Sequence, residues 1–343
     1  MIEEFSDPAI FGGPGQEVLR YPVSAGDGFA ILGEVSDNGA THQEAWLSSD
    51  GEKWERVRQI PAMDQAWLAG IAELPRGRLL AIGRIVSDPR TWTSDDAGRT
   101  WAVGTIAGVP PGTTFAQVVS GPAGVLLLGV DTSTRTEVPS LFWSPDGEEW
   151  TRVAMPADVF ARGQIRSVAA TRSGFLALGG RLPVEPAPIG DPFLGAKAAA
   201  WWSVDGRTWA SADVEDGPIL YGAWAGSEGN LGLGMNDKLG GATPAPWYSI
   251  DGRQWDPQHV TIESGAPAVW DGRIFMLRSK FVGSDAVVEL TESRDGIEWR
   301  VAGQTPEERT GGIGVIAPGA PGLIQVGGSG GDVTVWLIRW PEG

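Results

Sequence analysis

Short apolar runs bounded by glycine recur along the chain and set its hydrophobic pattern. Each run places four or five mostly apolar residues after a glycine, and six of the seven end in a second glycine. The seven copies lie at 28–33, 77–83, 124–129, 174–179, 229–234, 272–277 and 322–327. Runs of this length between glycines are typical of strands buried on both faces. The pattern therefore predicts seven copies of one buried strand.

A strand–turn–strand pattern follows each of the first six runs. Residues 141–153, LFWSPDGEEWTRV, show it best: an apolar strand, a Ser-x-Asp-Gly turn and a second strand opened by tryptophan. The aspartates of the six turns are Asp50, Asp96, Asp146, Asp205, Asp251 and Asp295, at steps of 46, 50, 59, 46 and 44 residues. A repeat of about 40–50 residues with this content predicts a β-propeller.

The two patterns together predict an all-β fold, a seven-bladed β-propeller of four-stranded blades in one domain spanning 1–343. The expected blades are 14–57, 64–104, 113–154, 163–210, 217–257, 264–302 and 311–340. The seventh blade ends after its third strand. Glu3-Glu4-Phe5 matches Glu148-Glu149-Trp150, so we expect residues 2–9 to supply the missing outer strand and close the ring.

The turn residues have a structural explanation. An aspartate side chain bonds backbone N–H groups just after it, and glycine supplies the positive φ of the turn. We expect the following tryptophan to be buried between neighbouring blades. The structural set is Ser48, Asp50, Trp54, Ser94, Asp96, Trp101, Ser144, Asp146, Trp150, Ser203, Asp205, Trp209, Ser249, Asp251, Trp255, Ser293, Asp295 and Trp299. An aromatic four residues before the aspartate should pack the third strand; Thr291 breaks this pattern in the sixth copy.

These turns resemble the Asp-box, or BNR, repeat of sialidases and related propellers, Ser-x-Asp-x-Gly-x-x-Trp. Only Ser94–Trp101 matches that spacing in full, and the other five copies are one residue shorter. The resemblance covers nearly the whole chain and implies a structural turn on the face opposite the ligand site. The seven-bladed assembly factors of photosystem II share the repeat and are non-enzymatic, which implies a scaffold role. They use a basic patch that is not visible in this acidic chain.

Composition excludes several classes of partner. A net charge of −17 and a pI near 4.5 disfavour nucleic acid and acidic membrane surfaces. The chain has no cysteine. It also has no run of eighteen apolar residues, so we expect no membrane insertion. The N-terminus has no signal-peptide pattern, so we expect a cytoplasmic protein, or an extracellular one if a leader was removed. His42 and His259 have no second ligand at zinc spacing; we expect no cofactor, and calcium stays open.

Candidate ligand-binding residues cluster where the inner strands are expected to begin. They are Arg20, Trp67, Gln117, Arg166, Tyr221 and Trp270. One interpretation is a plugged channel whose polar groups satisfy one another. The other is a pocket in which arginine binds a carboxylate and aromatics stack on a sugar or a peptide.

A sialidase-like activity is the enzymatic alternative. Leu19-Arg20-Tyr21-Pro22 resembles the Phe-Arg-Ile-Pro motif that supplies the first carboxylate-binding arginine of sialidases. The next arginine and aspartate of that family are replaced by residues 34–37, and no tyrosine follows Tyr248 to serve as nucleophile. We therefore assign no catalytic residue. The carboxylates Glu17, Glu34, Asp37 and Asp64 should be scattered around the rim instead of paired across a pocket.

One long loop departs from the repeat. Residues 181–198 carry four prolines, and the apolar Ile189, Phe193 and Leu194 either cover the channel mouth, touch a partner or pack back on their own blade. The sequence thus favours a monomeric, non-catalytic binding or scaffold propeller for a protein or glycan ligand. The ligand would bind the face formed by the inner-strand starts and the loops between second and third strands. The alternative is a sialidase-like glycoside hydrolase.

Overall fold

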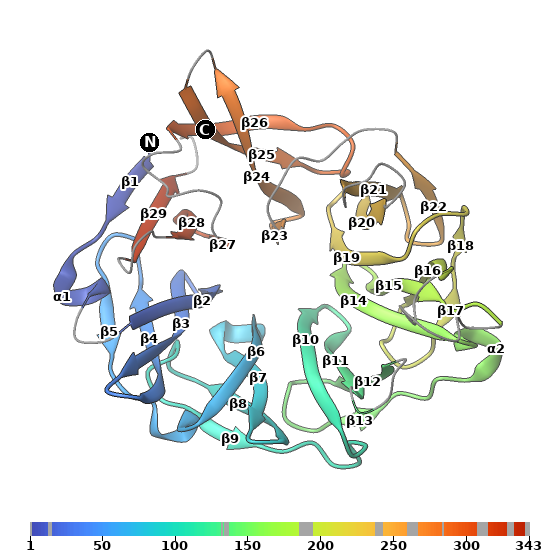
Figure 1. The fold of residues 1–343 in the computed structure, drawn as a ribbon, viewed down its shortest axis with the longest axis horizontal. Coiled ribbons are helices and arrows are strands. Elements are labelled where there is room, and N and C mark those ends of the chain that lie inside the picture. Colours follow the sequence, from blue (N-terminus) through green and yellow to red (C-terminus); the bar gives the residue numbers. More distant parts are fainter. Residues whose placement is uncertain are drawn as a thin grey trace.

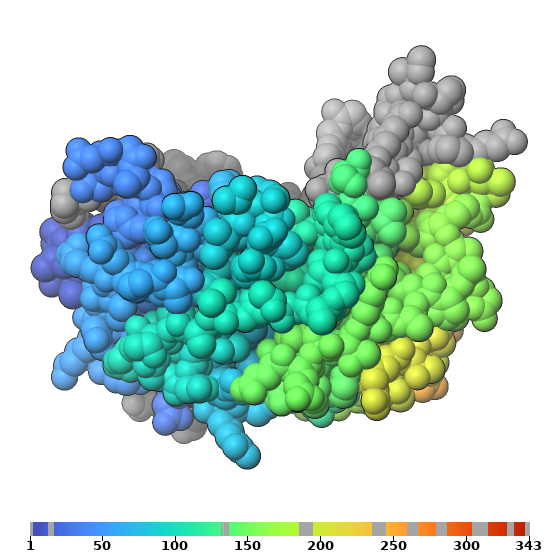
Figure 2. Space-filling view, turned by 90° about the horizontal axis from the view of Figure 1, so that it is seen from below, coloured from blue at the N-terminus to red at the C-terminus, as the bar shows by residue number. Residues whose placement is uncertain are grey.

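Seven antiparallel sheets stand side by side around a common centre (Figure 1). The computed structural model describes residues 2–12, 16–131, 133, 137–184, 195–236, 243–258, 267–282, 285–306, 315–327 and 333–339. Each sheet is one blade, and the blades follow in chain order around the wall of the ring (Figure 2). The predicted seven-bladed propeller is confirmed.

The blades are numbered here along the chain, with their strands running outward from the centre (Figure 1). Blade one holds β2 (Gln16–Ala25), β3 (Gly28–Asp37), β4 (Ala40–Ser48) and β5 (Glu55–Val57). Blade two holds β6 (Ala66–Glu73), β7 (Leu79–Ile85), β8 (Asp88–Ser94) and β9 (Ala102–Gly104). Blade three holds β10 (Thr113–Gly121), β11 (Gly124–Asp131), β12 (Val138–Ser144) and β13 (Thr151–Arg152).

The remaining blades keep this order. Blade four holds β14 (Gly163–Thr171), β15 (Gly174–Arg181), β16 (Lys197–Ser203) and β17 (Ala210–Ser211). Blade five holds β19 (Leu220–Ala225), β20 (Asn230–Asn236), β21 (Thr243–Ser249) and β22 (Gln254–Pro257), with β18 (Asp213–Val214) pairing in parallel on β22. Blade six holds β23 (Ala268–Trp270), β24 (Arg273–Val282), β25 (Asp285–Ser293) and β26 (Arg300–Pro306). Blade seven holds β27 (Val315–Gly319), β28 (Gly322–Gly327), β29 (Thr334–Arg339) and β1 (Ile2–Phe5).

The N-terminal strand closes the ring, as the sequence predicts. β1 pairs antiparallel with β29, from Ile2 opposite Ile338 to Phe5 opposite Val335. The strand is shorter than the expected 2–9. Asp7 accepts a hydrogen bond from the N–H of Ala9 at 2.9 Å and caps the one-turn helix α1 (Pro8–Phe11), which ends the extended segment.

Two contacts explain why glycine bounds the buried runs. A Cβ on Gly174 would lie 2.0 Å from the carbonyl oxygen of Ser203, on the third strand of the same blade. A Cβ on Gly179, at the other end of the run, would lie 1.7 Å from the carbonyl oxygen of Gln164 on the inner strand. At both positions a neighbouring backbone lies too close to leave room for a side chain, so glycine is required.

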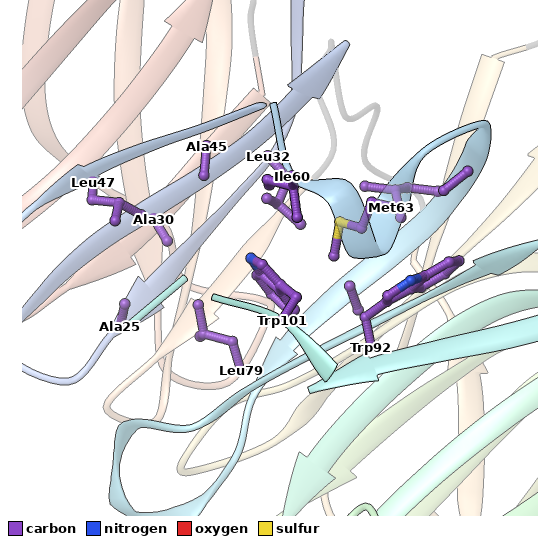
Figure 3. Packing of buried hydrophobic residues seen from close by; sticks show 13 residues of the cluster. Ala25, Ala30, Leu32, Ala45, Leu47, Ile60, Met63, Leu79, Trp92 and Trp101 are labelled. Atoms are coloured by element: carbon purple, nitrogen blue, oxygen red, sulfur yellow. The ribbon is translucent and has the colours of Figure 1, made fainter. Parts of the chain in front are cut away.

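The hydrophobic core lies mainly between blades. The cluster in Figure 3 joins Ala30 and Leu32 of blade one to Leu79, Trp92 and Trp101 of blade two. The third-strand aromatics are all fully or almost fully buried: Trp46, Trp92, Phe142, Trp201 and Trp247. The tryptophans that follow the turns all pack into clusters between two blades, as expected: Trp54, Trp101, Trp150, Trp209, Trp255 and Trp299.

Short helical turns connect the blades, and the third-strand tryptophans hold three of them. The indole N–H of Trp46 donates to Ile10 O in α1 at 2.8 Å, and that of Trp201 donates to Val159 O in α2 (Ala157–Phe160) at 3.0 Å. Trp92 does the same at 2.6 Å to Ala62 O in the 3₁₀ turn η1 (Pro61–Met63). A further 3₁₀ turn, η2 (Pro75–Gly77), lies between β6 and β7. Burying an indole therefore also satisfies its polar N–H group.

Candidate functional site

The two sides of the ring differ in what their residues do. We call the side where the inner strands begin, and where second and third strands are joined, the entrance face. The side of the Ser-x-Asp turns is the exit face. These definitions follow from the antiparallel strand order of each blade.

On the exit face, the Ser-x-Asp turns use their polar groups internally. In blade three Ser144 Oγ accepts the N–H of Gly147 at 2.8 Å, and Asp146 Oδ1 accepts the N–H groups of Glu148 and Glu149 at 2.9 and 3.3 Å. The indole N–H of Trp150 donates to Gly147 O at 3.1 Å. The same serine–glycine and tryptophan–glycine bonds recur in blades one, two, four, five and six. The Asp and Ser residues are therefore engaged in turn formation.

Arginines of two turns also staple adjacent blades. The Arg207 guanidinium of blade four lies 4.6 Å from the ring centroid of Trp143 in blade three. Arg253 of blade five lies 4.3 Å from that of Trp202 in blade four. Such cation–π contacts add to the apolar packing between blades.

On the entrance face, a β-bulge interrupts five of the inner strands. The extra residue follows directly after the one that faces the run-ending glycine. The five extra residues are Arg20, Ala69, Ala116, Arg166 and Tyr221. Three of the six candidate residues therefore share one position. A bulged residue leaves the ladder and is re-aimed, so its side chain is free of the sheet's pairing constraints.

Arg20 sits beside one carboxylate. Its Nε lies 3.6 Å from Glu34 Oε2, and its side chain is 48% exposed. The adjacent Tyr21 hydroxyl donates to Leu68 O at 2.6 Å and ties the inner strands of blades one and two. Burial raises the pKa of Tyr21; the Arg20 charge opposes that rise and the Glu34 charge adds to it. Arg20 is thus available to solvent but partly neutralised.

Glu17 does not lie beside Arg20, where a catalytic general acid or base would be expected. It is buried, and its Oε1 lies 2.6 Å from Arg56 Nη1. Arg56 also binds Glu44, with Nε 2.5 Å from Oε2. No ion pair within the described residues joins Asp37 or Asp64 to Arg20.

Gln117 is a link between blades. Its side-chain amide donates to Val168 O at 2.9 Å, and its Oε1 accepts the N–H of Val168 at 2.9 Å. Oε1 also accepts from the Ser167 hydroxyl at 3.2 Å, and Ser167 Oγ accepts the N–H of Ala223 in blade five at 3.2 Å. These hydrogen bonds link the inner strands of blades three, four and five.

Arg166 is held by an acid of blade three. Its Nη1 lies 2.5 Å from Glu137 Oε2, and its side chain is only 20% exposed. Tyr221 is 46% exposed at the start of the blade-five inner strand. Both residues occupy the bulged position of their inner strands, which places them on the entrance face.

Trp270 is not at the start of an inner strand. It is the last residue of β23 and pairs with Arg273 next to the hairpin turn, which puts it toward the exit face. The expectation for this residue is wrong because the second strand, β24, begins only three residues after Trp270, which leaves Trp270 at the hairpin. The six candidates therefore do not gather in one pocket.

Among the described residues of the entrance face, Trp67 is the most exposed aromatic side chain. It is 58% exposed, and the Arg84 guanidinium lies 5.6 Å from its ring centroid. The pair borders a cavity of about 280 Å³ that Gly83, Thr114 and Phe115 also line. The exposed face of the Trp67 ring can pack against an apolar group of a ligand while the Arg84 guanidinium binds a neighbouring carboxylate.

The remaining expectations concern metals, membranes and the long loop. His42 Nε2 lies 2.9 Å from Glu44 Oε1, and the described residues contain no group of three or more possible metal ligands. No helix in the described ranges is long and apolar enough to cross a membrane. His259, Ile189, Phe193 and Leu194 lie outside the described residues.

Sequence reasoning missed Arg84 and a groove between blades three and four. Arg84 follows the run-ending Gly83 and pairs with Trp67 across β6 and β7, so strand register was the signal that could have found it. The groove has a volume of about 660 Å³, and Arg152, Met155, Phe160 and Arg162 are among the residues that line it. Residues of β12, β13 and β14 line it together with the connection between blades three and four, and that connection lies outside the repeat.

The architecture defines the class of protein: a seven-bladed β-propeller closed by its N-terminal strand. No protein-family model and no curated protein sequence matches the chain. Among solved structures it is similar to YCF48 from Cyanidioschyzon merolae, with 14% identity, a TM-score of 0.52 and 98% of both chains covered. It is also similar to YCF48 bound to D1 peptide, with 12% identity, a TM-score of 0.50, and 98% of this chain and 95% of that chain covered.

A third similar structure is the β-propeller domain of the Trilobed protease from Pyrococcus furiosus. The identity is 12% and the TM-score 0.55, with 97% of this chain and 94% of that chain covered. That propeller has an open velcro topology, whereas here β1 pairs with β29. Identities this low establish a shared fold only.

Proposed function

We propose that the chain is a single-domain, non-catalytic binding propeller of the Asp-box, or BNR, type that recognises a protein segment on its entrance face. The observation that carries the proposal is the open Trp67 ring with Arg84 beside it at the edge of a cavity. Exposing an indole ring to water is unfavourable, so a ligand that covers it gains free energy. Tryptophan and arginine are also among the residues enriched at binding hot spots.

The pairing of the acids supports a binding role over hydrolysis. Glycoside hydrolysis needs two carboxyl groups flanking the bond, about 5–10 Å apart. Glu34 lies beside Arg20, while Glu17 is buried against Arg56. Neither arrangement resembles a free acid facing a second carboxylate across a pocket.

A peptide is the favoured ligand. The similar propeller YCF48 has a solved structure with D1 peptide bound. Trp67, Arg84 and Tyr221 would give an extended peptide two aromatic surfaces and one cation on the entrance face. A glycan would use the same stacking surfaces, so the experiment below includes both ligand classes.

The test is a binding screen of the purified chain against an array of immobilised 15-residue peptides and, in parallel, a glycan array. We expect peptide hits that Trp67→Ala removes and that Val204→Ala, an exposed residue of an exit-face turn, leaves intact. Hits confined to glycans would replace the peptide with a sugar ligand. Hits insensitive to Trp67→Ala would refute the assigned site.

The enzymatic alternative has its own assay. We expect the protein to leave a fluorogenic sialoside and common aryl glycosides intact. Turnover that Arg20→Ala abolishes while circular dichroism still shows a folded chain would overturn the non-catalytic proposal.

A further inference from the structure

The groove between blades three and four combines an apolar lining with two arginines. It opens between the outer part of blade three and α2, β14 and the end of β15, and encloses about 660 Å³. Met155, Phe160 and Leu182 provide apolar lining, and Arg152 and Arg162 line it as well. This volume lies in the range of about 300–1,000 Å³ typical of ligand sites. Both arginines are exposed, so both are accessible to a ligand.

A third arginine stands beside Arg162. The Arg181 guanidinium donates to Ala161 O at 2.9 Å, to Val159 O at 2.8 Å and to Ser211 Oγ at 3.0 Å, which fixes its position. Burial lowers the pKa of Arg181, and repulsion from the Arg162 guanidinium lowers it further. Two like charges are thus held close together.

The positive φ of Arg162 is explained by the connection between the blades and is not evidence of a ligand site. Its φ is 54°, and the positions that likewise lead into β6 and β10 have φ of 58° at Gln65 and 78° at Gly112. A positive φ is therefore the ordinary geometry before an inner strand here. It also means that asparagine, which tolerates this region, is a suitable replacement for Arg162.

Within the described part of the chain, no carboxylate pairs with Arg152, Arg162 or Arg181. Blade one shows what a paired arginine looks like in the same repeat. Arg56, which corresponds to Arg152 two residues after the turn tryptophan, is enclosed by Glu17 and Glu44.

The corresponding positions of blade three carry no acid. Glu44 pairs with Gly33 and Ser140 with Gly129, so these two residues are equivalent. Glu17 is likewise equivalent to Thr113, since each pairs two residues beyond that glycine. In a chain of net charge −17, Arg152 and Arg162 line a groove to which no described carboxylate contributes, whereas Asp213 and Asp216 line the neighbouring cavity together with Arg162 and Arg181.

We infer that this groove binds an acidic peptide segment of a partner protein, with an apolar side chain against Met155, Phe160 and Leu182 and carboxylates on Arg152 and Arg162. The guanidinium fork matches a carboxylate in two parallel hydrogen bonds. The carboxylates would offset the repulsion among the arginines, which a neutral ligand would not. This site is separate from the Trp67 cavity and does not depend on it.

The experiment uses fluorescence anisotropy with two labelled hexapeptides on the full chain. The acidic probe is Glu-Leu-Asp-Phe-Glu-Gly, and its matched amide is Gln-Leu-Asn-Phe-Gln-Gly. We expect the acidic probe to bind at least about tenfold more tightly, and added salt to weaken it. Arg162→Asn and Arg152→Gln should each weaken it about tenfold, as expected for loss of a charge-assisted hydrogen bond.

Three controls separate the explanations. Arg58→Gln removes an exposed arginine of blade one and should leave the affinity unchanged; an equal loss would point to net charge and refute the groove. Trp67→Ala should also leave it unchanged, so failure of the proposed function would show separately. Leu182→Asp should abolish binding by placing a like charge in the groove.

Three outcomes would overturn the inference. One is equal binding of the two probes, and another is no binding of the acidic probe. The third is Arg162-dependent binding of phosphatidylglycerol vesicles without peptide binding, which would assign the site to a membrane surface. Each variant's melting curve must match the parent for its result to count.

Discussion

Replacing Arg56 by alanine should destabilise the ring at its closure. The Arg56 side chain is 3% exposed and binds two carboxylates, Glu17 and Glu44, that are themselves 3% exposed. Its Nη1 also donates to Ile10 O at 3.2 Å and Gly12 O at 2.6 Å, the last carbonyls of the segment that carries α1. The guanidinium further lies 5.0 Å from the ring centroid of Trp46. One side chain therefore fastens the N-terminal segment to blade one.

The magnitude follows from what the substitution leaves behind. Breaking a buried ion pair by removing one partner typically costs about 3–5 kcal/mol, because the other charge stays buried without compensation. Here two carboxylates lose their cation, so we expect at least about 3 kcal/mol in Arg56→Ala. That is a large share of a typical stability of about 5–15 kcal/mol. The double change Glu17→Gln and Glu44→Gln in the Arg56→Ala background should restore part of the loss, since no buried charge then remains unpaired.

The assay is urea unfolding followed by circular dichroism, with limited proteolysis to detect release of the N-terminal segment. Arg58→Ala is the matched control, because it removes an exposed arginine two residues away and should change stability by less than about 0.5 kcal/mol. Arg56→Ala should also be cleaved before residue 16 at a protease dose that spares the parent. A loss below about 1 kcal/mol, or no change in cleavage, would refute the idea that Arg56 fastens the closure.

Three further outcomes test the closure, the turns and the staples between blades. Deleting residues 2–5 should expose the edge of β29, lower the melting temperature by many degrees and increase association in light scattering; a deletion that melts like the parent would refute the closure. Asp146→Ala should cost about 1–3 kcal/mol without changing peptide binding. The hydrogen bond from the Glu148 N–H lowers the pKa of Asp146 below its usual 3.8, against the effect of burial. The stabilisation by ionised Asp146 is therefore complete above the unfolded-state pKa and is lost as the pH falls through the lower folded-state pKa. An acid unfolding curve of Asp146→Ala identical to that of the parent would contradict this. Arg253→Ala should cost about 0.5–1 kcal/mol by removing the cation over Trp202, whereas Arg172→Ala, an exposed arginine of a blade-four hairpin, should cost less.

The fold could be predicted from the sequence because its main signals are local and repeated. Most glycines that bound the runs have a close backbone neighbour, as at Gly174 and Gly179, and six turns repeat the same serine and aspartate bonds. The sequence also predicts the closing strand, since Glu3-Glu4-Phe5 resembles Glu148-Glu149-Trp150, which leads directly into the outer strand β13 of blade three. Its end at Phe5 was missed, although Asp7-Pro8 is a helix-start signal.

The candidate site was harder because it depends on partners far apart in the sequence. Trp-x-Arg follows the turn in both blade one and blade three, yet Arg56 is buried between two acids and Arg152 is exposed. Only the pairing of strands distinguishes them. Gln117 likewise proved to be a link to Ser167 and Val168, about fifty residues away, which composition alone could not show. Trp270 was misplaced because the residues before its strand carry no clear repeat signal.

Repetition and specificity occupy different positions of the same blade. The residue that faces the inner strand just before the bulge is glycine in all five blades that carry one. A Cβ there would meet an inner-strand carbonyl oxygen at Gly33, Gly83 and Gly179, and the Thr113 side chain at Gly129. The bulged residue itself has no such restriction, and it is arginine in blades one and four, alanine in blades two and three, and tyrosine in blade five. The fold fixes where the bulged residue lies but does not restrict its residue type. Such a position can carry ligand-binding side chains without disturbing the fold. The exit face offers no equivalent, since its repeated serines and aspartates are committed to their turns. The bulged residue is therefore one source of chemical variety on the entrance face, beside the Trp67–Arg84 pair, and that face is where recognition is to be tested.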